Sequence, residues 1–103
     1  MKVFLDDVRD PPDDSWRRVF TAYEVIAMLT WDSNYISELS LDHDLGMGRV
    51  GTGMDVVNYM VESYNCPPVV IIHSGNTIAA KEMYLRLVDA FPDDDIRLEP
   101  RLL

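Results

Sequence analysis

The sequence contains a single cysteine and no long uninterrupted apolar run. Cys66 cannot form an internal disulfide, so the fold must be stable without one and the cytoplasm is the expected compartment. No apolar run approaches the roughly 18 residues that a membrane-spanning helix needs. The N-terminus already becomes acidic at Asp6 and Asp7, too early for a secretory signal peptide. We therefore expect neither a disulfide framework nor a membrane segment.

Basic residues are also scarce, with nine Lys and Arg against 18 Asp and Glu and a formal net charge of −9 at pH 7. Lys and Arg supply most of the affinity of proteins for nucleic-acid phosphates, so an extended nucleic-acid groove is not expected. A phosphate-bearing small molecule or an RNA end remains compatible if a divalent cation neutralises the carboxylates locally.

The length of 103 residues suits one domain over residues 1–103 with one core. Strand-like and helix-like segments alternate, which is typical of a parallel sheet with covering helices. Strands are expected at residues 2–5, 16–20, 38–41, 69–72 and 96–98, and helices after a capping box at residues 21–24, over about 54–64 and over about 77–91. The segment between the first two strands contains Pro11-Pro12 and several carboxylates, so a loop rather than a helix should make that crossover.

Acidic, histidine and amide side chains follow three of these strands. They are Asp6 and Asp7 after the first, Asp42, His43 and Asp44 after residues 38–41, and His73, Ser74 and Asn76 after residues 69–72. Ligands of open parallel α/β sheets bind just beyond the carboxyl ends of the strands. The pattern therefore predicts a site at this edge of the sheet.

The carboxylates of this edge are candidate metal ligands. Asp6, Asp7, Asp42 and Asp44 could place several carboxylates around one cation, and Mg²⁺ or Mn²⁺ prefers such hard oxygen ligands. The alternative is that they are caps and turn residues. Without a cation, crowded carboxylates would raise one another's pKa.

The two histidines are candidate catalytic groups. Imidazole titrates near neutral pH, so His43 and His73 could act as general acid and base on a phosphate ester. The alternative is that both are structural residues, with His43 pointing into the core or capping a strand and His73 held by hydrogen bonds. For His43 this alternative carries equal weight, because adjacent strand positions face opposite sides of the sheet. We expect the His73 ring to lie in a water-filled cleft with little burial.

Candidate phosphate ligands lie in the same segments. Ser74 and Asn76 precede a helix whose first amides favour anions, although Asn76 could equally be an ordinary N-cap. Arg9 is the basic residue nearest the acidic pair and could clamp a phosphate, or it could pair with Asp10 or Asp13.

Three strings carry a specific resemblance: LDDVRDPP at residues 5–12, SLDHDLG at 40–46 and IIHSGN at 71–76. Together they resemble the cyclic-phosphate-processing receiver domains of phages and bacteria, which derive from the receiver domains of two-component signalling. The resemblance implies a flavodoxin-like α/β fold with a five-stranded parallel sheet in the order 2-1-3-4-5. It also implies that Asp6-Asp7 help to hold Mg²⁺, that Asp42 takes the phosphoacceptor position and that Ser74 contacts the phosphoryl group.

One position departs from the receiver pattern. Glu99-Pro100 falls where receivers carry Lys-Pro, and the glutamate reverses the charge beside the phosphoryl group, which argues against phosphoacceptor signalling.

The leading hypothesis is metal-dependent binding or hydrolysis of a cyclic or terminal phosphate on a nucleotide or RNA end, with Asp42, His73 and His43 as catalytic residues. The alternative is a non-enzymatic pseudo-receiver that binds a protein partner through the fifth strand and C-terminus.

Overall fold

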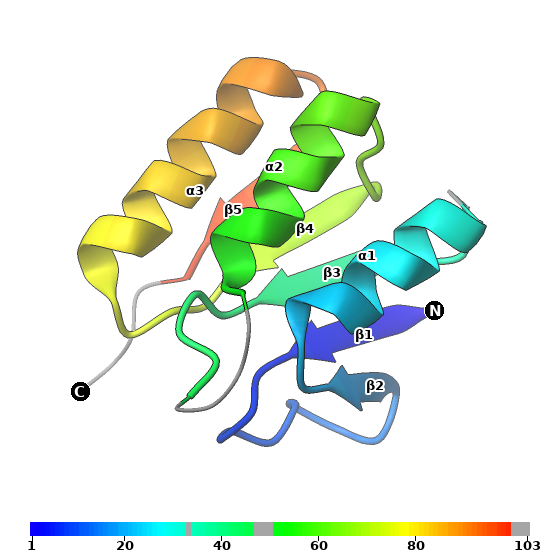
Figure 1. The fold of residues 1–103 in the computed structure, drawn as a ribbon, viewed down its shortest axis with the longest axis vertical. Helices are drawn as coiled ribbons and strands as arrows, with labels where there is room; N and C mark the ends of the chain where they lie inside the picture. Colours follow the sequence, from blue (N-terminus) through cyan, green and yellow to red (C-terminus); the bar gives the residue numbers. More distant parts are fainter. Residues whose placement is uncertain (33, 47–50, 100–103) are drawn as a thin grey trace.

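The fold is a five-stranded parallel sheet with three helices, as seen in a computed structural model that describes residues 1–32, 34–46 and 51–99 (Figure 1). The strand order is β2-β1-β3-β4-β5, and every neighbouring pair is parallel. The strands are β1 Lys2–Leu5, β2 Trp16–Val19, β3 Glu38–Leu41, β4 Val69–Ile72 and β5 Asp95–Leu98. This confirms the predicted receiver-like fold and strand order.

The three helices are α1 Ala22–Trp31, α2 Gly53–Ser63 and α3 Thr77–Ala90. Capping side chains explain where they begin: Thr21 and Thr52 form capping boxes, and the Asn76 side chain accepts a hydrogen bond from the first turn of α3. Tyr64, expected as the last residue of the second helix, is instead its exposed C-cap in the left-handed conformation (φ 52°).

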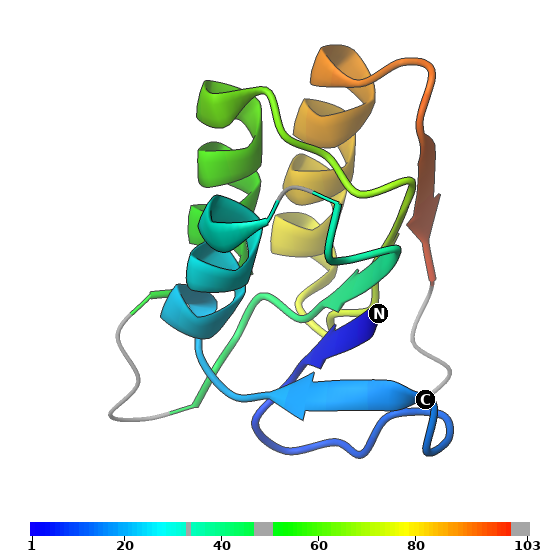
Figure 2. The same ribbon diagram turned by 90° about the vertical axis from the view of Figure 1, so that its right-hand side faces the viewer.

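All three helices lie on one side of the sheet (Figure 2). Crossovers between parallel strands are right-handed, so the side on which a connection lies depends on its direction across the sheet. The connections containing α1, α2 and α3 all run toward β5, whereas the β1–β2 connection runs the other way. That connection contains no helix, as its prolines predict, and the second face of the sheet consequently has no helix in the part of the chain described here.

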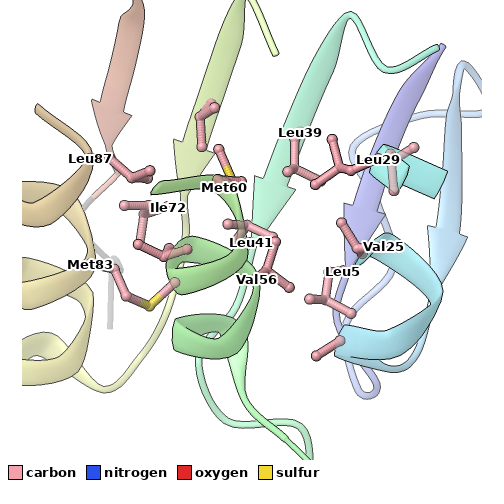
Figure 3. Close-up of a cluster of buried hydrophobic side chains, with 14 of the residues drawn as sticks. Leu5, Val25, Leu29, Leu39, Leu41, Val56, Met60, Ile72, Met83 and Leu87 are labelled. Atoms are coloured by element: carbon pink, nitrogen blue, oxygen red, sulfur yellow. The ribbon is translucent and has the colours of Figure 1, made fainter. Parts of the chain in front are cut away.

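The core lies between the three helices and the face of the sheet that they cover (Figure 3). Alternate strand residues point toward the helices and meet apolar side chains of α1, α2 and α3. Its fully buried members include Leu5, Leu39, Leu41 and Ile72 from the sheet and Val25, Leu29, Val56, Met60, Met83 and Leu87 from the helices. No helix among the described residues is long and apolar enough to span a membrane.

Candidate functional site

The hydrogen-bonded ladder of the sheet continues for one residue beyond four of the strands. The amides of Asp6, Asp42, His73 and Glu99 each donate to a neighbouring strand, over 3.2, 3.0, 2.9 and 2.9 Å. Because side chains alternate along a strand, these residues share the helix-free face with Phe4, Ser40 and Ile71. Asp7 and His43 lie one position further along the chain, so the same alternation does not place them on this face.

Asp6, Asp42 and His73 form a compact group at the carboxyl edge of the sheet. Each offers one potential ligand atom, and these three atoms lie within 4.8 Å of one another. All three side chains are buried, with exposed fractions of 0% for Asp6, 8% for Asp42 and 5% for His73. Burial and the nearby Asp6 charge raise the pKa of Asp42, against hydrogen bonds from Ser74 and the His43 amide. A cation would relieve this crowding of charge.

The Asp6 carboxylate is fixed in place by hydrogen bonds from both sides. Its Oδ1 accepts from the amides of Val8 (2.9 Å) and Arg9 (3.0 Å), which turns the chain out of β1. Its Oδ2 lies 3.1 Å from Nε2 of His73. The acidic loop is thereby anchored to the same carboxylate that faces the cluster.

His73 is a buried, fully engaged imidazole. Its ring stacks on Phe4, with centroids 4.4 Å apart and an interplanar angle of 7°. Nδ1 lies 2.6 Å from the Ser40 hydroxyl, opposite the contact of Nε2 with Asp6. The expectation that this ring is little buried is therefore wrong, because strand alternation directs it onto Phe4 and leaves it 5% exposed.

Burial lowers the pKa of His73, and the interaction with Asp6 opposes the shift. A neutral imidazole carries one N–H. The carboxylate oxygen facing Nε2 suits a proton on that nitrogen, and the Ser40 hydroxyl facing Nδ1 can either donate to the ring or accept from it.

Arg9 lies over the end of β4. Its Nη1 donates to the His73 carbonyl at 3.2 Å and is 4.0 Å from Oδ2 of Asp6. The alternative partners are engaged elsewhere, since Asp10 pairs with Arg18 (2.8 Å) and Asp13 accepts from Ser15. This leaves a half-exposed guanidinium beside the cluster.

Ser74 and Asn76 serve the start of α3. The buried Ser74 hydroxyl donates to Asp42 and accepts from the Asn76 amide at 3.1 Å. The Asn76 side chain accepts from the Ala79 amide at 3.1 Å, so the ordinary capping role holds for it.

The remaining predicted residues lie outside the group of three. His43 is half-buried, and its Nδ1 lies 2.6 Å from the exposed carboxylate of Asp44. The Asp7 carboxylate lies against Gly46, where an added Cβ would collide with it. Sequence reasoning missed Ser40, although its position two residues before Asp42 places both on the same face of β3.

A family model described as the cyclic-phosphate processing receiver domain matches residues 1–89. The chain belongs to this family. The comparison with curated proteins found no match. Membership gives this receiver domain a phosphate-related role, and the matched residues include Asp6, Asp42, His73 and Arg9 but end before Glu99.

Proposed function

We propose that this receiver domain binds Mg²⁺ or Mn²⁺ through Asp6, Asp42 and His73 and hydrolyses a cyclic or terminal phosphate on a nucleotide or RNA end. The observation that carries the proposal is the buried group of three potential ligand atoms within 4.8 Å. Its position at the carboxyl edge of a parallel sheet supports it, because ligands of such sheets bind there.

The donor set fits a divalent cation. Two carboxylates suit Mg²⁺ or Mn²⁺, and the imidazole shifts the preference toward Mn²⁺. A metal-binding histidine donates its other ring N–H to a fixed partner. The Ser40 hydroxyl, 2.6 Å from Nδ1, can donate or accept and so can orient the ring in either tautomer.

The phosphate would be held by groups beside the cluster. Arg9 offers a partly exposed guanidinium, and the first amides of α3 favour an anion next to Ser74 and Asn76. A bound cation would polarise the phosphoryl oxygens and activate water. Opening a cyclic phosphodiester adds water to phosphorus and breaks one P–O ester bond, and the released alcohol takes up a proton.

His43 is our candidate for donating that proton. It directly follows Asp42, is only half-buried and has Asp44 to orient its ring. The His73 ring is buried and held by Ser40, so we assign its Nε2 to ligation, with Nδ1–H donating to the Ser40 hydroxyl, rather than to proton transfer.

The test is to follow a 2′,3′-cyclic nucleotide by ³¹P NMR with Mn²⁺, with Mg²⁺ and with chelator. We expect metal-dependent conversion to a monoester. In Asp42→Asn the rate of conversion should fall by more than the roughly 10- to 100-fold that is typical of losing a group that only orients a metal ligand. Asp44→Asn is the matched control for metal binding, which it should retain because its exposed carboxylate lies outside the cluster, whereas its turnover should fall only as far as the orientation of His43 requires.

Calorimetric titration with Mn²⁺ separates binding from turnover. Metal and phosphate binding without product would reduce the function to binding alone. Equal Mn²⁺ affinity in wild type and Asp42→Asn would remove the proposed metal site.

A second candidate is a protein-interaction module. Trp31 at the end of α1 is 92% exposed, and it borders a groove of about 380 Å³ together with Arg17, Met28 and Tyr35. An exposed tryptophan beside an arginine is typical of contact surfaces. The sequence-based expectation placed such a surface at β5 and the C-terminus, of which residues 100–103 lie outside the described part of the chain. Loss of partner binding in Trp31→Ala, with catalysis intact, would support this role.

A further inference from the structure

The helix-free face of the sheet contains a cavity of about 280 Å³ that touches the candidate site. Strand residues, the β1–β2 loop and the residues that follow β4 and β5 line it, among them Phe4, Arg9, Asp10, Trp16, His73 and Glu99. The volume is just below the usual range of small-molecule pockets, roughly 300–1,000 Å³. Arg9 and His73 belong both to this cavity and to the proposed phosphate and metal site. A ligand held there by its phosphate could therefore extend into the cavity.

Aromatic rings run from the cluster into this cavity. His73 stacks on Phe4, and Phe4 meets Trp16 edge-on, with centroids 6.2 Å apart and an interplanar angle of 76°. Phe4 is nearly buried, whereas Trp16 is half-buried at the edge strand. Lys2 lies 5.4 Å from the centre of the Trp16 ring and helps to hold it. Trp16 is thus a supported ring at the end of an aromatic row that begins at the cluster.

We propose that this cavity binds the nucleobase of the phosphate-bearing ligand, with Trp16 as its stacking surface; the inference rests on the proposed function. Bases stack on aromatic side chains whatever their sequence, because each has a π-face. Glu99 adds a carboxylate acceptor to the lining, as does the Asp10 oxygen that is not paired with Arg18, and base edges carry N–H donors that such acceptors recognise. The ligand is therefore a nucleotide or a nucleotide at an RNA end rather than a phosphorylated sugar.

The geometry limits the ligand to one base in this cavity. The volume does not accommodate a run of stacked bases, and the formal net charge of −9 disfavours binding of a longer phosphate chain. Specificity would thus come from one terminal nucleoside beside the phosphate.

The experiment compares a 2′,3′-cyclic nucleotide with glycerol 1,2-cyclic phosphate, which has the cyclic phosphate but no base. Binding of both in the presence of Mn²⁺ is measured by calorimetry. We expect the nucleotide to bind about 5- to 150-fold more tightly, the range that stacking one base supplies. Trp16→Leu should remove this preference while leaving binding of the glycerol compound unchanged, and Trp16→Phe should restore much of it.

Fluorescence gives an independent readout that needs no change at Trp16. Trp31→Phe leaves Trp16 as the sole tryptophan. The nucleotide should then alter the emission of Trp16, and the glycerol compound should not. Matching emission changes with the two compounds would contradict base stacking.

The outcomes separate the two proposals. Equal affinity of wild type for both compounds, or a preference that survives in Trp16→Leu, overturns the base pocket and leaves the phosphate site standing. Failure of both compounds to bind overturns the proposed function, and the base pocket with it.

Discussion

At the scale of single residues, an offset of one position separates the two histidines. His73 directly follows β4 and continues its ladder, so its ring lies on the helix-free face against Phe4. His43 is the second residue after β3, so strand alternation does not place its ring on that face, and the ring pairs with Asp44 instead. The same offset groups Asp42, rather than Asp44, with Asp6.

His73→Ala should therefore destabilise the domain. The change removes a stacked ring and leaves Ser40 and Asp6 without their shared partner, at a cost of about 2–4 kcal/mol. His43→Ala is the matched control, and we expect it to cost less than about 1 kcal/mol because its partner is exposed. Urea unfolding without metal measures both. A His73→Ala variant as stable as His43→Ala would show that the burial adds nothing.

The raised pKa of Asp42 predicts how metal-free stability depends on pH. The folded state holds the Asp42 proton more tightly than the unfolded chain does. In the unfolded chain the pKa of this carboxyl is near 3.8. Between the unfolded and folded pKa values the native state binds more protons, so ionisation of Asp42 lowers stability as pH rises through that window. Asp42→Asn should flatten this part of the profile and raise stability above it. A wild-type profile unchanged by the substitution would contradict the shift.

At the scale of elements, the start of α2 lies directly against the end of β3. The Gly53 amide donates to the His43 carbonyl at 3.0 Å, and a Cβ on Gly53 would collide with the Asp42 carbonyl oxygen and meet Met83. The helix can approach the cluster only because this residue has no side chain.

Gly53→Ala should accordingly cost about 1–3 kcal/mol and weaken Mn²⁺ binding by displacing Asp42. Gly75→Ala is the control, because its Cβ would meet only Arg9 at 3.6 Å, an ordinary contact, and its effect should stay within about 0.5 kcal/mol. Thermal unfolding and Mn²⁺ titration measure the two effects. Equal stability of the two variants would contradict the tight approach.

The elements themselves could be predicted because their signals are local. Period-2 and period-3.6 patterns, the capping box at Thr21 and the prolines at residues 11–12 act within a few residues, and the structure follows them to within one or two positions. The contacts of His73 with Ser40 and Asp6 join residues 33 and 67 positions apart. They depend on strand register and crossover direction, which the local patterns do not contain. The edge of the sheet was predicted, but the arrangement of side chains along it was not.

At the scale of the whole molecule, excess negative charge acts on every element at once. The formal net charge is −9, and the ion pairs of Lys2 with Glu38, Arg18 with Asp10 and Arg97 with Asp95 have at least one partly exposed partner. Such pairs contribute little, so repulsion among the remaining carboxylates should dominate. This general repulsion must be distinguished from relief at Asp6 and Asp42 by one bound cation.

Monovalent salt should therefore stabilise the metal-free domain. Screening shortens the range of repulsion from about 10 Å at 0.1 M to about 3 Å at 1 M salt. We expect Tm to rise between these concentrations by several degrees, since about 1 kcal/mol corresponds to roughly 4–8 °C in a domain of this size. Asp42→Asn should show the same salt response, because the substitution removes only one unit of a formal net charge of −9. The rise produced by Mn²⁺ at constant ionic strength should disappear in that variant, since it depends on the cluster. A Tm that falls with salt would mean that the ion pairs outweigh the repulsion. An Mn²⁺ response retained in Asp42→Asn would mean that the cation acts on the general charge and not at the site.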